Sequence, residues 1–270
     1  ARYANHTFKR DQSRLPPGAV FVGIFSTRKN SVLRQTIRAT WMRVIKDYGY
    51  DHKFFCGIQN NTPDVFLDEQ RVYDDVVELP VVEHYRNVTK KAFEMFRWVV
   101  RERSDALFFL RVDDDVYLRP QPLLDQLNFR PPVRYVWGFW DYASPVEREP
   151  HLKHYNSYDD YPDPEDRFPP YVRGCLHVIS LDVLHKVVHY KGVFPSAHPD
   201  DPAFGVYLWE LVKEGGLVLN NDDRDENRFA LMPMCGAHFS NLHNLTWLVH
   251  HLNRSVIHCM WQKDLDDGYY

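Results

Sequence analysis

The chain has 270 residues, of which 44% are hydrophobic and 26% are charged, so its length suits one large domain or two small ones. Its 33 Lys and Arg residues oppose 37 Asp and Glu residues, which gives a formal net charge of −4. This balance argues against nucleic acid and an anionic membrane surface as partners. No apolar run of about 18 residues is present, so we expect any membrane anchor of the protein to precede Ala1.

The first predicted strand is the apolar segment Ala19–Thr27, and a helical pattern, SVLRQTIRATWMRVI, begins at Ser31. Together they predict a βα unit. Lys53–Ile58 predicts a second strand, followed by a polar loop, and Asp75–Pro80 predicts a third. Between Val88 and Arg103 the apolar residues fall at helical spacing, which predicts an amphipathic helix.

The next segment, ALFFL at Ala106–Leu110, is a continuous apolar run typical of a buried parallel strand. Strands that alternate with amphipathic helices predict an α/β protein with helices on both sides of the sheet and ligands at the carboxyl ends of the strands. The segment Asp141–Pro170, rich in Pro, Asp, Glu and Tyr, is too long for an ordinary connection, and we interpret it as a functional lobe or mobile loop. We expect residues 19–270 to form a single domain after an N-terminal segment at 1–18.

The cysteines and the glycosylation sequons bear on the compartment of the protein. The four cysteines form no C-x-x-C pair, which argues against a zinc ribbon, and either disulfides or buried free thiols are compatible with their spacing. Five Asn-X-Ser/Thr sequons together favour a secretory compartment. The residues are Cys56, Cys175, Cys235 and Cys259, and Asn5, Asn60, Asn87, Asn244 and Asn253.

Three consecutive carboxylates, Asp113, Asp114 and Asp115, follow the ALFFL strand in RVDDDVYLRP. Oxygen ligands match a hard divalent cation such as Mn²⁺ or Mg²⁺, and such an ion in turn holds a diphosphate. The alternative is that the carboxylates cap a turn and face water. A trio without a neutralising partner beside an apolar strand is costly, so the pattern favours a cation site.

A second acidic pair, Asp200 and Asp201, precedes Pro202 and a helical pattern. Asp201 before Pro202 is what an N-cap followed by proline at the first helical position looks like. A carboxylate held at the start of a helix is equally well oriented to act as a general base. Both interpretations remain open at this point.

Near the N-terminus, Arg34 and Arg38 lie four residues apart on one predicted helix face, beyond a strand end that carries Ser26 and Thr27. Arginine side chains clamp phosphate oxygens, and a solvated helix face is the alternative. His238 is a candidate to complete a metal site, with His258 as its competitor. The aromatic residues around the long irregular segment suit either sugar stacking or core packing; they are Trp137, Trp140, Tyr142, Tyr155, Tyr158 and Tyr161.

Six short motifs occur in one order that resembles the beta-1,3-galactosyltransferase family, and the resemblance extends from Phe21 to Leu248. The motifs are IRATW at 37–41, YRNVTKK at 85–91, RVDDDVYLRP at 111–120, YVWG at 135–138, PPYVRGCLHVIS at 169–180 and DDPAFG at 200–205. The resemblance implies a GT-A fold with a mixed, mainly parallel sheet, a UDP-sugar donor, Mn²⁺ as cofactor and an inverting reaction. It also implies a type II membrane protein of the Golgi lumen.

The resemblance further implies roles for single residues. Asp115 is the direct metal ligand with His238, and Asp201 is the base. The residues implied around the donor are Thr27, Arg34, Arg38, Lys91, Asp113 and Asp114, and those implied on the acceptor side are Trp137, Trp140, Gly174 and Asp200. The chain departs from the family at Leu176 and His177, where Gly and Tyr are usual. It departs again at Asp200–Pro202, where Glu-Asp-Val is common and Asp-Asp is closer to the fringe-like branch.

The leading hypothesis is therefore a Mn²⁺-dependent transferase that moves a sugar, with galactose favoured, from a UDP-sugar to a glycan on protein or lipid in beta-1,3 linkage. One alternative within the family is a beta-1,3-N-acetylglucosaminyltransferase. An aspartyl phosphatase of the haloacid dehalogenase type, with Asp113 as nucleophile, is an alternative from another class, although Tyr117 replaces the small residue usual there. A catalytically silent, lectin-like module is the third.

Overall fold

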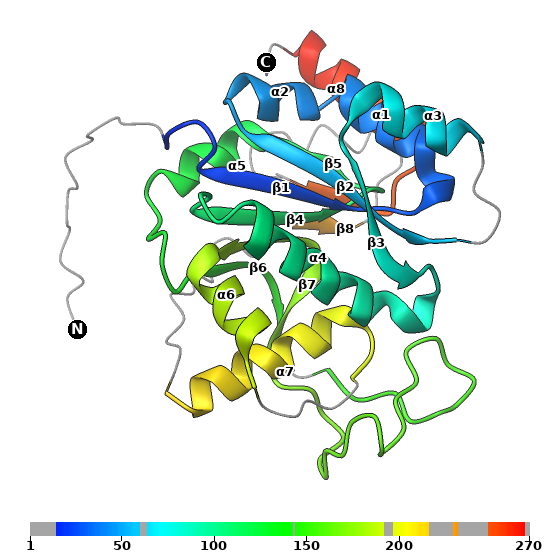
Figure 1. Ribbon diagram of the computed structural model, residues 1–270, viewed down its shortest axis with the longest axis vertical. Coiled ribbons are helices and arrows are strands. Elements are labelled where there is room, and N and C mark those ends of the chain that lie inside the picture. Colours follow the sequence, from blue (N-terminus) through cyan, green and yellow to red (C-terminus); the bar gives the residue numbers. More distant parts are fainter. Residues whose placement is uncertain are drawn as a thin grey trace.

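The computed structural model describes residues 15–59, 64–142, 144–191, 197–215, 229–231 and 248–267. In this part of the chain a six-stranded sheet has the order β3-β2-β1-β4-β7-β6 (Figure 1). Strands β1 to β4 are parallel, β7 runs antiparallel to β4, and β6 runs antiparallel to β7. The mixed, mainly parallel sheet confirms the predicted fold class. The strands are β1 Val20–Phe25, β2 Asp51–Ile58, β3 Val76–Val82, β4 Phe108–Asp113, β6 Val136–Asp141 and β7 Tyr171–Ser180.

Helices cover both faces of this sheet, because the buried strands carry apolar residues on both sides. Val20, Val22 and Ile24 of β1 belong to one core, and Phe21 belongs to the other, as the two-residue period of a strand requires. The first core is closed by α1 Ser31–Ala39, α2 Met42–Asp47, α5 Pro120–Leu127 and α8 Arg254–Asp266. The second is closed by α4 Val88–Glu102, α6 Leu181–His189 and α7 Asp200–Lys213.

The helical pattern that begins at Ser31 forms two helices instead of the single one predicted. The chain leaves the helix at Thr40, whose φ and ψ are −117° and −120°, and its hydroxyl bonds back to the Thr36 carbonyl at 2.7 Å. The break lets Trp41 enter the core, where its indole N–H donates to the Val116 carbonyl at 3.1 Å. The break therefore fixes α1 against the segment that follows the acidic trio.

The polar loop predicted after Lys53–Ile58 contains a helix, α3 Asp64–Tyr73. Its apolar residues Val65 and Val72 are 59% and 72% exposed, whereas Phe66 is 1% exposed. The helix thus lacks a continuous apolar face, which explains why the periodicity did not indicate it. It also carries Glu69, which is buried.

A small second sheet joins the acidic trio to the C-terminal part of the chain. Strand β5 Tyr117–Leu118 pairs antiparallel with β9 Leu248–His250, which pairs parallel with β8 Phe229–Leu231. The amide of Leu252 donates to the carbonyl of Asp115 at 2.8 Å. The segment after β9 therefore lies against the trio.

The predicted lobe at Asp141–Pro170 is an irregular loop that projects from the sheet in Figure 1. Within it, residues 144–170 are organised by Arg148, which donates to Asp166 at 2.8 Å and to the carbonyls of Ser157 and Tyr161 at 2.9 Å each. A charged guanidinium with several acceptors can replace regular secondary structure as the source of local order. We call residues 144–170 the 144–170 loop.

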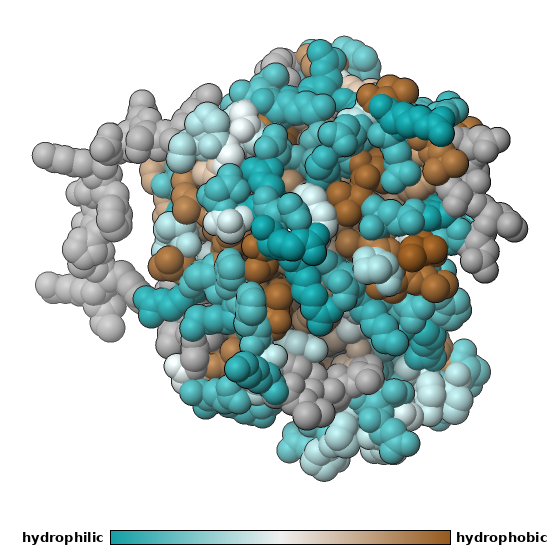
Figure 2. Space-filling model, in the orientation of Figure 1, coloured by the Kyte–Doolittle hydropathy of each residue, from teal (hydrophilic) through white to brown (hydrophobic). Residues whose placement is uncertain are grey.

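Cys56 and Cys175 are free and buried, whereas Cys259 is disulfide-bonded. Cys235 and His238 lie outside the described residues. Hydrophilic residues cover most of the face in Figure 2, and the exposed apolar side chains form separate patches, as is usual for protein surfaces. Among the helices that the structure describes, none combines the length and the apolar character that crossing a bilayer requires.

Candidate active site

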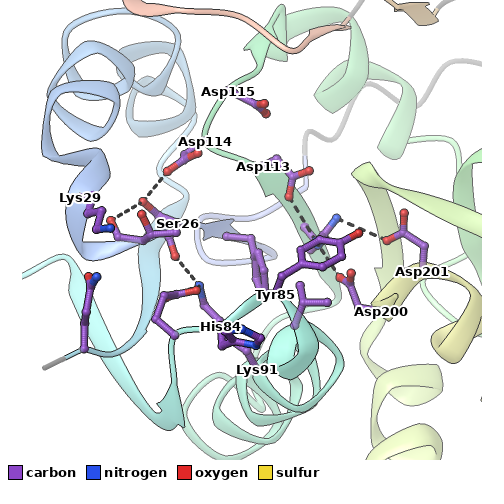
Figure 3. A pocket seen from close by; sticks show the side chains of 16 residues that line it. Ser26, Lys29, His84, Tyr85, Lys91, Asp113, Asp114, Asp115, Asp200 and Asp201 are labelled. Carbon is purple, nitrogen blue, oxygen red and sulfur yellow. Dashed lines mark hydrogen bonds and ion pairs between the residues drawn. The ribbon is translucent and has the colours of Figure 1, made fainter. Parts of the chain in front are cut away.

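A cleft of about 560 Å³ opens where the parallel strands end (Figure 3). Its lining comes from residues at or just after the ends of β1, β2, β3 and β4, from the start of α4, and from the first turn of α7 on the other side. The carboxyl ends of parallel strands meet at one edge of a sheet, so the topology itself gathers these side chains. They include Ser26, Thr27 and Lys29 after β1, Gln59 after β2, Glu83, His84 and Tyr85 after β3, Asp113, Asp114 and Asp115 at the end of β4, and Asp200 and Asp201 on α7.

Asp114 is the structural member of the trio. It is buried, and it accepts hydrogen bonds from the Ser26 hydroxyl at 2.5 Å and the Asn30 amide at 2.9 Å. Burial raises the pKa of Asp114 to about 6, although both hydrogen bonds favour the charged form. Because its oxygens are committed to these donors, Asp114 fixes the end of β4 to the segment after β1.

The other two carboxylates are more accessible. Asp113 is 25% exposed with its Oδ1 3.2 Å from Nη2 of Arg111, and Asp115 is 33% exposed with its Oδ2 3.5 Å from Nδ1 of His251. His251 has a φ of +64°, an uncommon conformation for a residue other than glycine. The sequence interpretation missed His251, although two histidines directly follow the apolar run of TWLVHH at 246–251 and are the signal that marks this position. His258, the competing candidate, is exposed on α8 and outside the cleft lining.

The oxygen atoms of these side chains are the kind of ligand that a hard divalent cation takes. No cluster of three or more His, Cys, Asp or Glu residues forms a complete metal cage among the residues described. Mg²⁺-like cations are usually held by one or two carboxylates together with substrate phosphates and water instead of by such a cage. Asp115 and Asp113, with His251 adjacent, provide that kind of incomplete, oxygen-rich site.

Arg111 is the charge that holds the acidic groups of the cleft together, and the sequence interpretation did not single it out. It is 3% exposed on β4, and its Nη2 donates to Asp200 at 2.9 Å while its Nη1 lies 3.9 Å from Asp201. With Asp113 it thus faces three carboxylates. A single buried guanidinium reduces the repulsion among them, and its removal would leave uncompensated buried charge.

Asp201 is a partly buried carboxylate with a raised pKa. Burial and the neighbouring Asp200 raise the pKa of Asp201 to about 7, although Arg111 acts in the opposite direction. The pKa of Asp200 is also raised, chiefly by burial. The capping interpretation of Asp201 is wrong, because the N-cap residue of α7 is Pro199 and Asp201 lies inside the first turn.

Gly174 of β7 lies directly behind this arrangement. A Cβ at Gly174 would be 2.0 Å from Nη1 of Arg111 and 2.1 Å from Oδ1 of Asp201, both far inside van der Waals contact. The residue was expected on the acceptor side. The structure places it where only glycine lets Arg111 and Asp201 come together.

Two of the cations expected around the donor do not line the cleft. Arg34 is fully buried and binds Glu69 at 2.6 Å and 2.9 Å. Arg38 binds Asp75 at 2.6 Å and 2.8 Å and Glu69 at 2.7 Å. Arg34 also donates to the Ser26 hydroxyl at 3.0 Å and to the Thr27 carbonyl. It therefore ties α1 to α3 and to the segment after β1, whereas Arg38 ties α1 to α3 and to Asp75 just before β3. Neither arginine is among the residues that line the cleft. We do not propose them as phosphate contacts.

Lys91, Thr27 and Lys29 do line the cleft. Lys91 is buried and its ammonium lies 2.8 Å from Glu83, with a further bond to the Ser26 carbonyl. Lys29 is exposed in the short 3-10 helix η1, Arg28–Asn30. Among the described cations of the cleft, Lys29 is thus the one at the surface, whereas Lys91 and Arg111 are held by carboxylates.

The tryptophans expected on the acceptor side are core residues. Trp137 and Trp140 are 3% and 8% exposed and pack on opposite faces of the sheet. Leu176 and His177, at which the chain departs from the family, are likewise buried. His177 stacks on Phe204 at 5.5 Å, and burial lowers its pKa to about 3. These departures alter the packing beneath the cleft and not its lining.

Comparison with known proteins identifies sequence relatives. The model of the Galactosyltransferase family matches residues 33–212, two thirds of the chain. Beta-1,3-galactosyltransferase GALT1 of Arabidopsis thaliana is 29% identical over 75% of this chain and 32% of the plant protein. Human beta-1,3-galactosyltransferase 5 is 28% identical over 74% of this chain and 66% of that protein. Human UDP-GalNAc:beta-1,3-N-acetylgalactosaminyltransferase 1 is 27% identical over 65% of this chain and 55% of that protein.

The chain thus spans about a third of the plant relative and just over half of the human N-acetylgalactosaminyltransferase. Among solved structures, a glycosyltransferase involved in the glycosylation of the major capsid of PBCV-1 aligns with a TM-score of 0.49 and 10% identity. That alignment covers 91% of this chain and 99% of the other.

Proposed function

Because the chain belongs to the galactosyltransferase family of glycosyltransferases, we propose that its cleft binds a UDP-sugar and transfers the sugar to a glycan hydroxyl with inversion, forming a beta-1,3 linkage. Galactose is the favoured sugar, since galactosyltransferases are among the relatives. The observation that carries the proposal is that carboxylates from two elements lie on opposite walls of one cleft. Asp113 and Asp115 lie at a strand end, and Asp201, with a raised pKa, lies on the other wall.

The acceptor side of the reaction follows from Asp201. Its carboxylate accepts the proton of the acceptor hydroxyl as the oxygen attacks the anomeric carbon, and the bond from that carbon to the diphosphate oxygen breaks on the opposite side. One displacement of this kind inverts the configuration and needs no covalent enzyme intermediate. Asp200 and Arg111 position the base, since Arg111 contacts both aspartates.

The donor side is assigned to the strand end. Asp115 and Asp113 would hold Mn²⁺, or Mg²⁺, and a cation bound there supplies neutralisation of the charge that grows on the departing diphosphate. Lys29 adds an exposed positive charge on the same side of the cleft. Asp114 contributes indirectly, because it fixes the position of its two neighbours through Ser26 and Asn30.

Replacement of the base tests this proposal. Asp201→Asn removes the proton acceptor and keeps the shape, so we expect transfer to fall by about 10²–10⁴-fold while UDP binding with Mn²⁺ stays near wild type. Asp47→Asn, at an exposed position on α2, is the matched control and should transfer normally. Full transfer by Asp201→Asn would overturn the assignment of the base.

The identity of the donor sugar needs a separate test. A panel of UDP-galactose, UDP-N-acetylglucosamine and UDP-N-acetylgalactosamine with Mn²⁺, scored by binding and slow hydrolysis, identifies the donor without knowledge of the acceptor. Preference for an N-acetylhexosamine would support the alternative within the family. Glycan binding without any turnover would support the lectin-like module. We do not retain the aspartyl phosphatase, because the family match covers two thirds of the chain.

We also propose a secretory location, with the Golgi lumen and a type II anchor as its specific form. The disulfide-bonded Cys259 supports an oxidising compartment, as do the sequons in the sequence. Localisation of the full-length protein against Golgi markers, with and without glycosidase treatment, tests this assignment.

A further inference from the structure

We propose that Tyr85 is a specificity-determining residue of the cleft, whose ring positions the acceptor sugar beside Asp201 and is itself held in place by the 144–170 loop. The inference rests on the proposed function and extends it to the choice of acceptor. It assigns the loop, which contains no proposed catalytic group, a role in substrate selection.

The first observation is the place of the ring. Tyr85 begins the 3-10 helix η2, Tyr85–Asn87, which starts three residues after the end of β3 at Val82. It lines the same cleft as Asp113, Asp200 and Asp201. Figure 3 shows its ring extending across the cleft near these carboxylates. The pKa of Tyr85 is raised to about 12 by burial and by the negative charge of Asp200 and Asp201, which agrees with this proximity.

The second observation is how the ring is held. The hydroxyl of Tyr85 lies 2.6 Å from Nδ1 of His154, the ring meets that of His198 edge-on at 4.8 Å, and the ammonium of Lys153 lies 4.5 Å from the ring centroid. His154 and Lys153 belong to the 144–170 loop. The side chain therefore has partners on the loop side that restrict its rotation, and it remains 36% exposed.

The third observation is that the loop is anchored beside the base. Asn156 is fully buried; its side-chain oxygen accepts from the amide of His198 at 2.7 Å, and its side-chain nitrogen donates to the His198 carbonyl at 2.5 Å. His198 lies two residues before Asp200. The positions of His154 and of the carboxylates on α7 are thus linked through one short set of hydrogen bonds.

A sugar ring is the ligand that suits this position. An aromatic face packs against the C–H face of a pyranose, and the polar tip of tyrosine tolerates the surrounding hydroxyl groups and water. The base acts on the acceptor hydroxyl, so a platform beside Asp201 meets the acceptor sugar, whereas the diphosphate of the donor belongs to the Asp115 side. The tryptophans that the sequence suggested for this role are buried. Among the described residues of the cleft lining, Phe25 and Tyr85 are the Phe, Tyr or Trp side chains, and Tyr85 is the one whose charge environment includes Asp200 and Asp201.

Acceptor binding measured separately from donor binding tests the inference. In the presence of UDP and Mn²⁺, the affinity for methyl β-galactopyranoside and other methyl glycosides is followed by saturation-transfer NMR, which needs no turnover. Tyr85→Ala removes the platform, so we expect acceptor affinity and acceptor KM to weaken by about tenfold. The affinity for UDP and the slow hydrolysis of the donor should stay within about twofold.

The role of the loop is tested by two smaller changes. Tyr85→Phe and His154→Ala each break the bond between the ring and the loop, and we expect each to weaken acceptor binding by about threefold and to alter the preference among glycosides. The double variant should be no worse than either single variant, because both remove the same contact. Tyr190→Phe, which removes a hydroxyl bonded to Glu214 at 2.6 Å outside the cleft, is the control and should bind acceptor normally.

The outcomes separate the two proposals. If Tyr85→Ala folds, binds UDP and keeps wild-type acceptor affinity, the inference about Tyr85 is wrong while the proposed function stands. If Tyr85→Ala loses UDP and acceptor equally, the ring serves the donor and the inference is again wrong. If wild type neither transfers nor hydrolyses any UDP-sugar, or if Asp201→Asn transfers normally, it is the proposed function that fails.

Discussion

Replacement of Gly174 by alanine is expected to displace Asp201 and Arg111 without removing any functional group. In Gly174→Ala the new Cβ would stand 2.0 Å from Nη1 of Arg111 and 2.1 Å from Oδ1 of Asp201. Ordinary contact requires about 3.5 Å or more, so one or both side chains must move by roughly 1.5 Å. Both atoms are at the ends of side chains, so the fold can survive while the base is displaced.

The expected magnitudes follow from that displacement. Overpacking of this kind costs about 1–3 kcal/mol of unfolding free energy, which lowers the melting temperature by several degrees. A misplacement of about 1 Å at a reacting group costs roughly 100-fold in rate, so we expect kcat to fall at least that far. Thermal unfolding and steady-state transfer assays on the same preparation measure the two effects.

Gly138→Ala is the matched control for crowding. A Cβ at Gly138 of β6 would be 2.2 Å from Cγ2 of Val172 and 3.0 Å from Cβ of His177, so it crowds the neighbouring strand without touching Arg111 or Asp201. We expect a similar loss of stability and near-normal kcat. If both variants lost the same activity, or if Gly174→Ala kept full activity, the close approach of Arg111 and Asp201 would not be what the glycine serves.

Three further predictions concern other groups. Lys29→Ala should weaken UDP binding by about threefold to tenfold at low salt and less at high salt, whereas the exposed Lys46→Ala should not; equal effects would remove Lys29 from the donor site. The pKa of Asp201 is raised to about 7, and the base must be charged to accept a proton. The value of kcat/KM should therefore rise with pH up to about 7 and then level off. A flat profile from pH 5 to 8 would contradict this assignment. Glu69→Gln should cost about 3–5 kcal/mol of unfolding free energy, because it leaves two buried arginines short of a partner. UDP affinity of the folded variant should change little. A selective loss of UDP affinity would return those arginines to the donor site.

The parallel strands β1 to β4 were predictable from sequence because their signals are local, whereas β6 and β7 were not predicted as strands. The apolar runs before Ser26 and Asp113 encode strands that are buried on both faces, and alternation with amphipathic helices implies parallel pairing. Parallel pairing in turn places the ends of β1 to β4 at one edge, so the cleft itself was predictable at the level of strands. The acidic trio was prominent for the same reason, since carboxylates directly after such a strand are unusual.

The partners of the arginines were not predictable by the same reasoning. Arg34 and Arg38 were interpreted as phosphate contacts because their acidic partner, Glu69, lies on α3, a helix whose apolar residues are largely exposed. Without a periodic pattern there, nothing in the sequence placed a buried carboxylate opposite α1. A charge pattern on one helix does not show whether a distant element neutralises it.

The contacts at the centre of the site were also not predictable from the sequence. Arg111 faces inward from β4, but only the antiparallel pairing of β7 with β4 and the start of α7 bring Gly174 and Asp201 to it. His251 reaches Asp115 because β9 pairs with β5. Each of these contacts joins segments more than 60 residues apart in the sequence, so spacing alone carries no signal for them.

The central claim is that the end of β4 binds the diphosphate of a nucleotide through a divalent cation. Calorimetric titration of UDP into the wild-type protein and into Asp115→Ala, each with Mn²⁺ and with EDTA, tests this claim most directly. We expect measurable binding by wild type only when Mn²⁺ is present, and loss of that binding in Asp115→Ala with an unchanged melting temperature. Equal UDP affinity with and without the cation, or unchanged affinity in Asp115→Ala, would contradict it.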